Sequence, residues 1–303
     1  DSFIASLTNP NTADILLNNP HLDLIITDDL NKNTFWKVVK DIKKNKFTDG
    51  LLVMPTERAA YQMFLAGIKN RIGVGRKLYE VITNMKSVSR NKYVPLRHES
   101  DYCMDLARAI GVKTNDLTPE IFITDEERIY GKEILNKLRV NDNDFKIIVH
   151  TGSGKSSGNW SEEKYLKLIG EILIKKEKAK IILTAKEMSK SFRESILSLN
   201  ESRIVFADTN IYRLRDLICI IANTDLLIAA STGPLHLASA LDIKSVGLFC
   251  HRRMNSPELW GAKGRKAVNI EVSKEYCDRC CSEDKEICRF EDGIKTEEVL
   301  EFV

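Results

Sequence analysis

Continuous apolar runs alternate with amphipathic stretches along the second half of the chain. The apolar runs predict strands at residues 145–153, 179–185, 202–208, 225–231 and 245–250. Between them, apolar residues recur at helical spacing, which predicts helices at residues 161–176, 187–200, 212–224 and 234–242. Strands that are apolar throughout and alternate with helices are typical of a parallel sheet covered on both faces. The second half is therefore predicted to be a doubly wound α/β domain.

The first half alternates in the same way, less regularly. Strands are predicted at residues 1–8, 22–28, 49–55 and 70–75, and helices at residues 32–45, 57–68 and 99–112. The polar stretch 113–120 interrupts the pattern and marks a boundary near Thr118. We therefore expect two α/β domains, residues 1–118 and 119–303, and a terminal helix at 294–303. Ligands of such sheets bind beyond the carboxyl ends of the strands.

Composition narrows the class of protein. The chain has 303 residues, 43% of them hydrophobic and 29% charged, which excludes disorder. Basic and acidic residues nearly balance, and the net charge of +3 is too small to indicate a nucleic-acid partner. No apolar run approaches the roughly 18 residues of a membrane span, and no signal peptide is visible. Single cysteines in apolar surroundings, without an export signal, indicate the cytoplasm.

A loop after the first strand of the second half looks like a nucleotide-binding P-loop at Gly154-Lys155-Ser156. That motif needs a glycine at the position of Val149. It also needs a helix that begins at the Lys and Ser, but here Gly158 lies just beyond them. We therefore exclude a P-loop NTPase. Two interpretations of the loop remain: its backbone N–H groups and Lys155 bind a phosphate, or it is a plain Gly-rich loop.

Polar and turn-forming residues stand where another buried strand passes into a helix. Ser231 and Thr232 end the strand, Gly233 permits close approach to the backbone, and Pro234 suits the first turn of a helix. His236 follows in that turn. The helix end, with its N–H groups and partial positive charge, is a ready anion site. The alternative is a well-capped turn with a packed histidine.

Four of the seven cysteines cluster near the end of the chain, at Cys277, Cys280, Cys281 and Cys288. Four thiolates can hold a structural zinc ion. Reduced thiols and a disulfide are the alternatives, because two of the cysteines are adjacent.

Several segments in order resemble one family. The segment 231–241, "STGPLHLASAL", lies between "DLLIAA" and "KSVGLF" and closely resembles the signature of the family nine glycosyltransferases, the bacterial lipopolysaccharide heptosyltransferases and their relatives. Further segments resemble the family in the same order: "ADILLNNPHLDLIITD", "NRIGVGRK", "HESDYCMDLARAIGV", "HTGSGKSSGNWSEEKYLKL" and "CDRCCSEDKEIC".

The resemblance implies a GT-B fold, in which two doubly wound Rossmann-like domains face each other across a cleft. It implies inverting transfer of a sugar, without a metal, from a nucleotide-diphosphate donor, classically ADP-heptose, to a lipopolysaccharide-core or related glycan. Residues 1–118 would form the acceptor side and residues 119–303 the donor domain. For such an acceptor, the resemblance implies that the protein is cytoplasmic and peripheral at the inner membrane.

The family's motifs also imply roles for individual residues. The donor diphosphate is assigned to the helix start, Ser231, Thr232, Gly233, Pro234 and His236, and to the Gly-rich loop, Ser153, Gly154 and Lys155. Glu187 holds the place of a ribose-binding Glu, or is a solvated carboxylate of a first helical turn. Arg58, Arg76 and Lys77 are candidates for an anionic acceptor, with plain surface charge as the alternative.

The chain departs from the family pattern in three places. Ser231 stands where Asp is common, and Gly158 where Lys or Arg is common. The family's general base, an Asp on a Gly-Asp turn, is expected upstream of residue 1, because Asp1 aligns with the second strand of the family. Two alternative functions therefore stay open: a non-catalytic nucleotide-sugar binder, and an epimerase or hydrolase of the same architecture.

Overall fold

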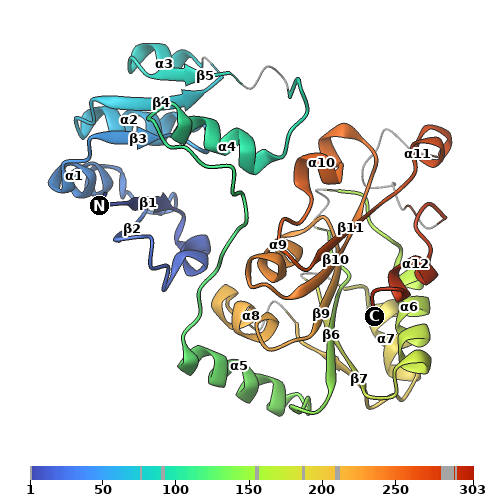
Figure 1. Cartoon of the computed structure of the whole chain (residues 1–303). Coiled ribbons are helices and arrows are strands. Elements are labelled where there is room, and N and C mark those ends of the chain that lie inside the picture. Colours follow the sequence, from blue (N-terminus) through green and yellow to red (C-terminus); the bar gives the residue numbers. More distant parts are fainter. Residues whose placement is uncertain are drawn as a thin grey trace. The chain divides into compact units, whose positions relative to one another are not determined.

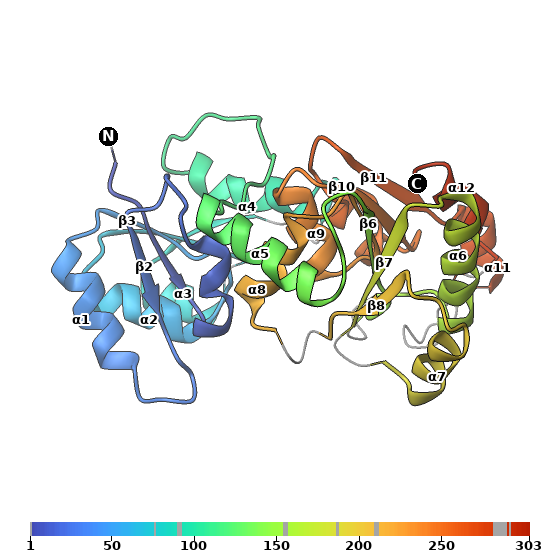
Figure 2. The same cartoon turned by 90° about the horizontal axis from the view of Figure 1, so that it is seen from below.

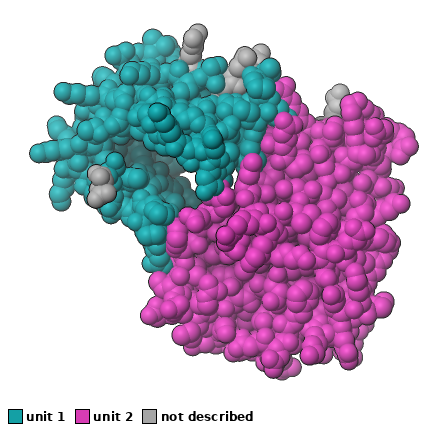
Figure 3. Space-filling view, viewed as in Figure 1, with its two compact units in different colours: residues 1–117 teal, residues 118–303 magenta. Residues whose placement is uncertain are grey.

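The computed structural model divides the chain into two units, Asp1–Leu117 and Thr118–Val303, which Figure 3 shows in different colours. It describes residues 2–75, 77–89, 93–153, 157–185, 188–208, 212–280, 290 and 292–303. The division falls one residue before the predicted boundary at Thr118. Each unit has parallel strands and a hydrophobic core of its own.

The second unit is built on a parallel sheet of six strands in the order β11-β10-β9-β6-β7-β8. The strands are β6 (Phe145–His150), β7 (Ala179–Thr184), β8 (Ile204–Phe206), β9 (Leu226–Ala230), β10 (Lys244–Phe249) and β11 (Ala267–Glu271). The chain winds outward from β6 through β7 and β8, then returns to β9 and winds the other way. This doubly wound order confirms the predicted α/β class, and it places the switch point between β6 and β9, where such sheets bind ligands.

Helices cover both faces of this sheet (Figures 1 and 2). Those of the second unit are α5 (Asp125–Lys137), α6 (Glu162–Lys175), α7 (Lys190–Ser198), α8 (Leu214–Ile221), α9 (Gly233–Ala240), α10 (Pro257–Trp260), α11 (Lys274–Cys280) and α12 (Thr296–Leu300), with a 3₁₀ turn, η2, at Arg253–Asn255. Helices α6, α7 and α12 lie together on one face, and α5, α8 and α9 on the other.

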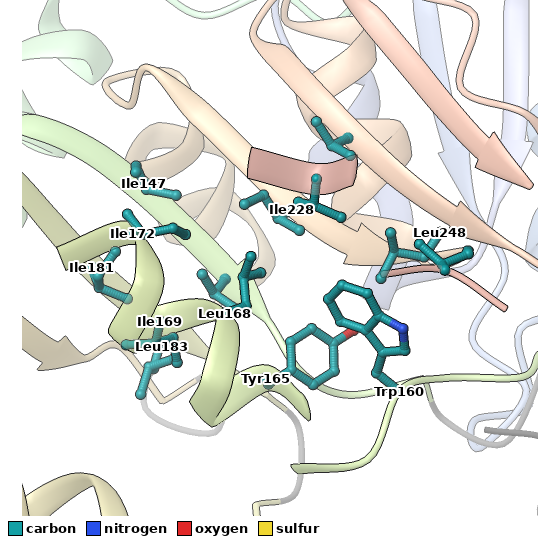
Figure 4. Close-up of a cluster of buried hydrophobic side chains, with 14 of the residues drawn as sticks. Ile147, Trp160, Tyr165, Leu168, Ile169, Ile172, Ile181, Leu183, Ile228 and Leu248 are labelled. Carbon is teal, nitrogen blue, oxygen red and sulfur yellow. The ribbon is translucent and has the colours of Figure 1, made fainter. Parts of the chain in front are cut away.

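The core of the second unit lies between the sheet and α6 (Figure 4). Ile147, Ile181 and Ile228 on the strands are fully buried, as are Leu168 and Ile172 on the helix. Each such side chain contributes about 1.5–3 kcal/mol by leaving water. This rigid layer holds the carboxyl ends of the strands, and the loops that follow them, in place.

The first unit is smaller and its strands are shorter. Strands β1 (Ala5–Thr8) and β2 (Leu24–Thr27) pair in parallel, and β3 (Asp49–Leu51), β4 (Asn70–Val74) and β5 (Lys86–Val88) form a second parallel sheet. The helices are α1 (Phe35–Asn45), α2 (Glu57–Leu65), α3 (Leu78–Ile82) and α4 (Glu99–Arg108), with a 3₁₀ helix, η1, at Pro10–Leu16. None of the helices in the described ranges of either unit has the length and apolarity that crossing a bilayer requires.

Candidate functional site

Helix α9 begins at the switch point, directly after the buried strand β9. Thr232 is its N-cap residue and is extended, with φ −143° and ψ 165°, and Gly233 and Pro234 open the first turn. The Thr232 side chain makes no capping hydrogen bond. Its hydroxyl oxygen is buried and, within the described part of the chain, has no hydrogen-bond partner. A buried hydroxyl of this kind costs free energy until a ligand pairs with it.

The space in front of this helix end is open. Gly233 is exposed, and a Cβ atom built on it would meet no atom within 4 Å. The first-turn N–H groups of a helix lack intrahelical partners and carry a partial positive charge. His236 lies one turn along, where its backbone N–H donates to the Thr232 carbonyl at 3.4 Å. The end of α9 therefore has features that suit an anionic group, and the anion site stays a prediction.

The loop after β6 is tied to the end of β9. The Ser157 hydroxyl donates a hydrogen bond of 3.2 Å to the carbonyl oxygen of Ser231. The Asn159 side-chain amide donates to the carbonyl oxygen of Thr151 at 2.7 Å, which folds the loop back on itself. Ser153 lies in this loop and is partly exposed. Gly154 and Lys155, the other residues predicted there, lie outside the described residues.

Tyr165, on α6, also hydrogen-bonds to the loop after β6. Its hydroxyl donates to Oδ1 of Asn159 at 2.7 Å, and the backbone of Ala230 also hydrogen-bonds to it. Tyr165 is fully buried, and burial raises the pKa of its hydroxyl above the ordinary value. The ring of Trp160 packs edge-on against it, with centroids 5.5 Å apart (Figure 4). The hydroxyl therefore stays protonated and holds Asn159 beside the end of β9.

A buried pair of side chains joins the carboxyl ends of β6 and β7. Nδ1 of His150 lies 2.9 Å from Oγ1 of Thr184. Burial lowers the pKa of His150 to about 4, so its imidazole is neutral at pH 7. Glu187, the predicted ribose ligand that follows this strand, lies outside the described residues.

Sequence reasoning missed the residues that position this site. Ser157, Asn159 and Tyr165 act through side-chain hydrogen bonds between different elements, and Tyr165 lies in a helix that the sequence predicts without indicating this role. The one local signal was the run of small polar residues after β6, which is typical of a loop that bonds to its own backbone.

The predicted acceptor residues of the first unit have different surroundings. The Arg58 guanidinium binds the carboxylate of Asp28 through Nε at 2.6 Å and Nη2 at 2.8 Å. Gln62 and Thr34 donate to the same carboxylate at 2.8 and 2.6 Å. These bonds, that of Arg58 foremost, lower the pKa of Asp28 to about 2. Arg58 is thus engaged within its own unit.

Lys77 is exposed just before α3, and Arg76 lies outside the described residues. Of the two predicted acceptor residues that the structure describes, Arg58 and Lys77, Lys77 is the exposed one.

The proposed zinc cluster has no support in the described part of the chain. Cys277 is buried and Cys280 exposed, both on α11, whereas Cys281 and Cys288 lie outside the described residues. Among the residues that the structure describes, no group of three or more His, Cys, Asp or Glu is placed to hold a metal ion.

Comparison with known protein families gives one match over most of the chain. The model of glycosyltransferase family 9 (heptosyltransferase) matches residues 35–289. A Haemophilus influenzae protein named "Putative glycosyltransferase" is 29% identical over 251 residues, which cover 80% of this chain and 71% of that protein. The lipopolysaccharide core heptosyltransferase OpsX of the same organism is 25% identical over 245 residues, covering 77% of this chain and 65% of OpsX.

Solved structures resemble the whole fold. A family 9 glycosyl transferase from Veillonella parvula superposes with a TM-score of 0.79 at 18% identity, over 99% of this chain and 86% of that chain. The E. coli heptosyltransferase WaaC with ADP gives a TM-score of 0.63 at 12% identity, over 99% of this chain and 98% of that chain. These likenesses support the GT-B architecture, in which each of the two units is an α/β domain.

Proposed function

The chain belongs to glycosyltransferase family 9, and from this premise we propose that it transfers a heptose from ADP-heptose to a lipopolysaccharide core or a related glycan. OpsX is named as a lipopolysaccharide core heptosyltransferase, and WaaC is described with ADP, which supports this choice of acceptor, sugar and nucleotide. Residues 119–303 would then hold the donor and residues 1–118 the acceptor.

One observation carries the proposal: the buried hydroxyl of Thr232 at the open end of α9, which has no hydrogen-bond partner among the residues that the structure describes. A diphosphate oxygen placed there would accept a hydrogen bond from Thr232 and from first-turn N–H groups, and the helix dipole would favour its charge. The open space at Gly233 allows the phosphate to reach the backbone. Pro234 fixes the first turn, and Ser231 is held by Ser157.

The proposed reaction inverts the anomeric carbon. The acceptor hydroxyl oxygen forms a bond to that carbon while the bond to the diphosphate oxygen breaks, and the hydroxyl proton passes to a general base. The end of α9 would stabilise the charge that develops on the departing diphosphate, which is the role of an oxyanion site. We propose that these fixed donors, rather than a metal ion, supply that stabilisation. We assign no residue as the base.

Calorimetric titration with ADP, UDP, GDP and CDP tests the donor site. We expect one diphosphate to bind, and the double change Thr232→Val with Gly233→Val to weaken it at least roughly tenfold, the loss of about 1.4 kcal/mol. Single changes Lys155→Ala and His236→Ala test two further residues assigned to the donor. Thr48→Val is the matched control, because this exposed threonine precedes β3 in the other unit. Unchanged binding in the double variant would contradict the assignment.

A transfer assay then separates the functions that stay open. Release of ADP from ADP-heptose that depends on a lipopolysaccharide-core acceptor supports the transferase. Turnover without any acceptor would indicate an epimerase or a hydrolase instead. Tight donor binding without turnover under either condition would indicate a non-catalytic binder.

A further inference from the structure

Helix α3 turns its apolar residues toward solvent, whereas a helix that packs on a core turns them inward. Leu78, Val81 and Ile82 are 76%, 71% and 56% exposed, whereas Glu80 is 1% exposed. The three apolar positions are spaced i, i+3 and i+4 and therefore share one side of the helix. An exposed cluster of large apolar side chains on a folded unit marks an interaction surface more often than a neutral one.

The inward face of α3 is fixed by specific bonds. The Glu80 carboxylate accepts hydrogen bonds from the Val74 N–H at 2.8 Å and from the Ser87 hydroxyl. Tyr79 packs against the hydrophobic core of the unit. Rotating α3 to hide its apolar side would turn Glu80 toward water and leave the buried N–H of Val74 without its acceptor, which is unfavourable. The apolar side is therefore held outward.

The chain around α3 is strongly basic. The segment 69–92 contains one acidic residue, the buried Glu80, and seven basic ones, of which Arg71 is also buried: Lys69, Arg71, Arg76, Lys77, Lys86, Arg90 and Lys92. Lys77 precedes α3, Lys86 begins β5, and both are exposed. Figure 1 shows α3 between β4 and β5 on the chain path of the first unit. Apolar side chains beside lysines complement the interface of an anionic bilayer, where acyl chains lie beneath phosphate groups.

We propose that the α3 face, defined as Leu78, Val81 and Ile82 with the flanking Lys77 and Lys86, is a docking surface for an anionic phospholipid bilayer. The three apolar side chains enter the headgroup region and the two lysines contact lipid phosphates. Met54, 76% exposed, follows β3, the parallel neighbour of β4, and so adds an apolar side chain at the edge where α3 begins. The apolar residues of this surface and Lys86 have no assigned part in the proposed transfer, whereas Lys77 is shared with the candidates for the anionic acceptor.

Co-sedimentation of the full chain with lipid vesicles tests the proposal. We expect binding to vesicles of phosphatidylcholine mixed with phosphatidylglycerol, and much weaker binding to pure phosphatidylcholine. The triple change Leu78→Gln, Val81→Gln and Ile82→Gln should lower the partition coefficient at least roughly tenfold. The change of Lys77→Glu with Lys86→Glu should lower it by a similar factor and reduce its dependence on salt.

Matched variants in the other unit control for general effects. Ile174→Gln with Leu197→Gln replaces apolar residues that are 88% and 60% exposed, and Lys137→Glu with Lys178→Glu makes the same change of charge. Both should bind vesicles like the unchanged chain. Circular dichroism checks that every variant is folded.

Three results would overturn the proposal: no binding of the unchanged chain to anionic vesicles, equal binding by the α3-face variants, or equal loss in the control variants. Sedimentation velocity adds a further test. If the triple change converts a dimer into a monomer and vesicle binding is absent, the α3 face joins two copies of the chain instead. Failure of nucleotide binding would leave the vesicle result unaffected.

Discussion

The hydroxyl of Tyr165 donates a hydrogen bond of 2.7 Å to Oδ1 of Asn159, and so joins the first turns of α6 to the loop that follows β6. The same Asn159 holds the carbonyl oxygen of Thr151 at 2.7 Å. A single buried hydroxyl thereby positions a loop beside the proposed diphosphate site. This site lies at the carboxyl ends of β6 and β9, the neighbouring strands between which the sheet has its topological switch point.

Tyr165→Phe should weaken nucleotide binding without removing any group that touches the nucleotide. The change leaves Oδ1 of Asn159 without the Tyr165 donor, and a buried polar group left unpaired costs about 1–3 kcal/mol. We expect a lower free energy of unfolding in urea and a several-fold weaker nucleotide affinity. Tyr61→Phe, in the other unit, is the control. If Tyr165→Phe lowers stability and leaves affinity at the level of the control, the loop is not held by this bond.

Gly233→Ala should obstruct the ligand and spare the fold. A Cβ at this position meets open space, so the free energy of unfolding should change by less than about 0.5 kcal/mol. The added methyl would occupy the space in front of the α9 backbone, and we expect nucleotide affinity to fall several-fold by calorimetry.

Gly170→Ala is the matched control for Gly233→Ala. Gly170 also faces open space, inside α6 and away from the end of α9. Alanine there should stabilise the chain by about 0.5–1 kcal/mol, because a glycine within a helix is unfavourable. Nucleotide affinity should be unchanged. An equal loss of affinity in both variants would mean that the effect does not act through the end of α9.

The strands of the second unit were predictable because both faces of the sheet are covered. Runs such as residues 226–230 are apolar throughout, and they form β9. The edge strand β11 was missed because none of its residues is fully buried and its sequence mixes polar with apolar residues. Helix α5 was missed because it is strongly charged, although Thr124 and Glu127 form a capping box that the sequence does contain.

In the candidate site, too, some features could be predicted from the local sequence and others could not. Thr232, Gly233 and Pro234 are neighbours in sequence, so a helix start could be inferred locally, and it is found there. The bond between Ser157 and Ser231 joins residues 74 positions apart, and no pattern along the chain signals it. Arg58 could be identified as a charged residue near a helix start, but its partner Asp28 lies 30 positions away and is chosen by the tertiary fold.

His150 should make the stability of the second unit depend on pH. Its pKa is about 4 in the folded chain, against 6.5 for the unburied group, so the unfolded chain binds the proton more tightly. The stabilisation is therefore complete above pH 6.5 and is lost as the pH falls toward 4. Between pH 7.5 and 5 we expect a loss of about 2 kcal/mol from this group.

Urea unfolding of the unchanged chain and of His150→Gln, at a series of pH values, measures the contribution of His150. Subtracting the two curves removes titrations that both chains share. The difference between them should narrow by about 2 kcal/mol as the pH falls over this range. A difference that is constant with pH would show that His150 does not titrate on unfolding.

Arg58→Ala should destabilise the first unit, because it leaves the buried Asp28 carboxylate without its counter-charge. Removing one partner of such a pair costs roughly 2–3 kcal/mol for a partly exposed arginine. Asp28→Asn with Arg58→Ala should recover part of this loss, since the neutral amide can still bond to Thr34 and Gln62. The free energy of unfolding in urea for the two single variants and the double variant measures the coupling. Independent, additive losses would contradict the pairing.

The Asp28 pair also sets an acid limit for the first unit. The pKa of Asp28 is lowered from 3.8 to about 2, so its stabilisation is present above pH 3.8 and disappears as the pH falls toward 2. This window lies below that of His150, and a scan from neutral to acid pH should therefore weaken the second unit first. Fluorescence separates the two, because Trp36 belongs to the first unit and Trp160 and Trp260 to the second. Each unit is then followed with the other unit's tryptophans replaced by Phe.

Chelation should leave sugar transfer and nucleotide binding unchanged. If the N–H groups of α9 and the Thr232 hydroxyl stabilise the departing diphosphate, no divalent ion is needed for that step. We expect the same nucleotide affinity and the same rate of acceptor-dependent ADP release with and without EDTA. The control is addition of Mg²⁺ to the treated sample, which should have no effect. A rate that falls with EDTA and returns with Mg²⁺, while affinity in Thr232→Val stays normal, would transfer the stabilising role from α9 to a metal ion.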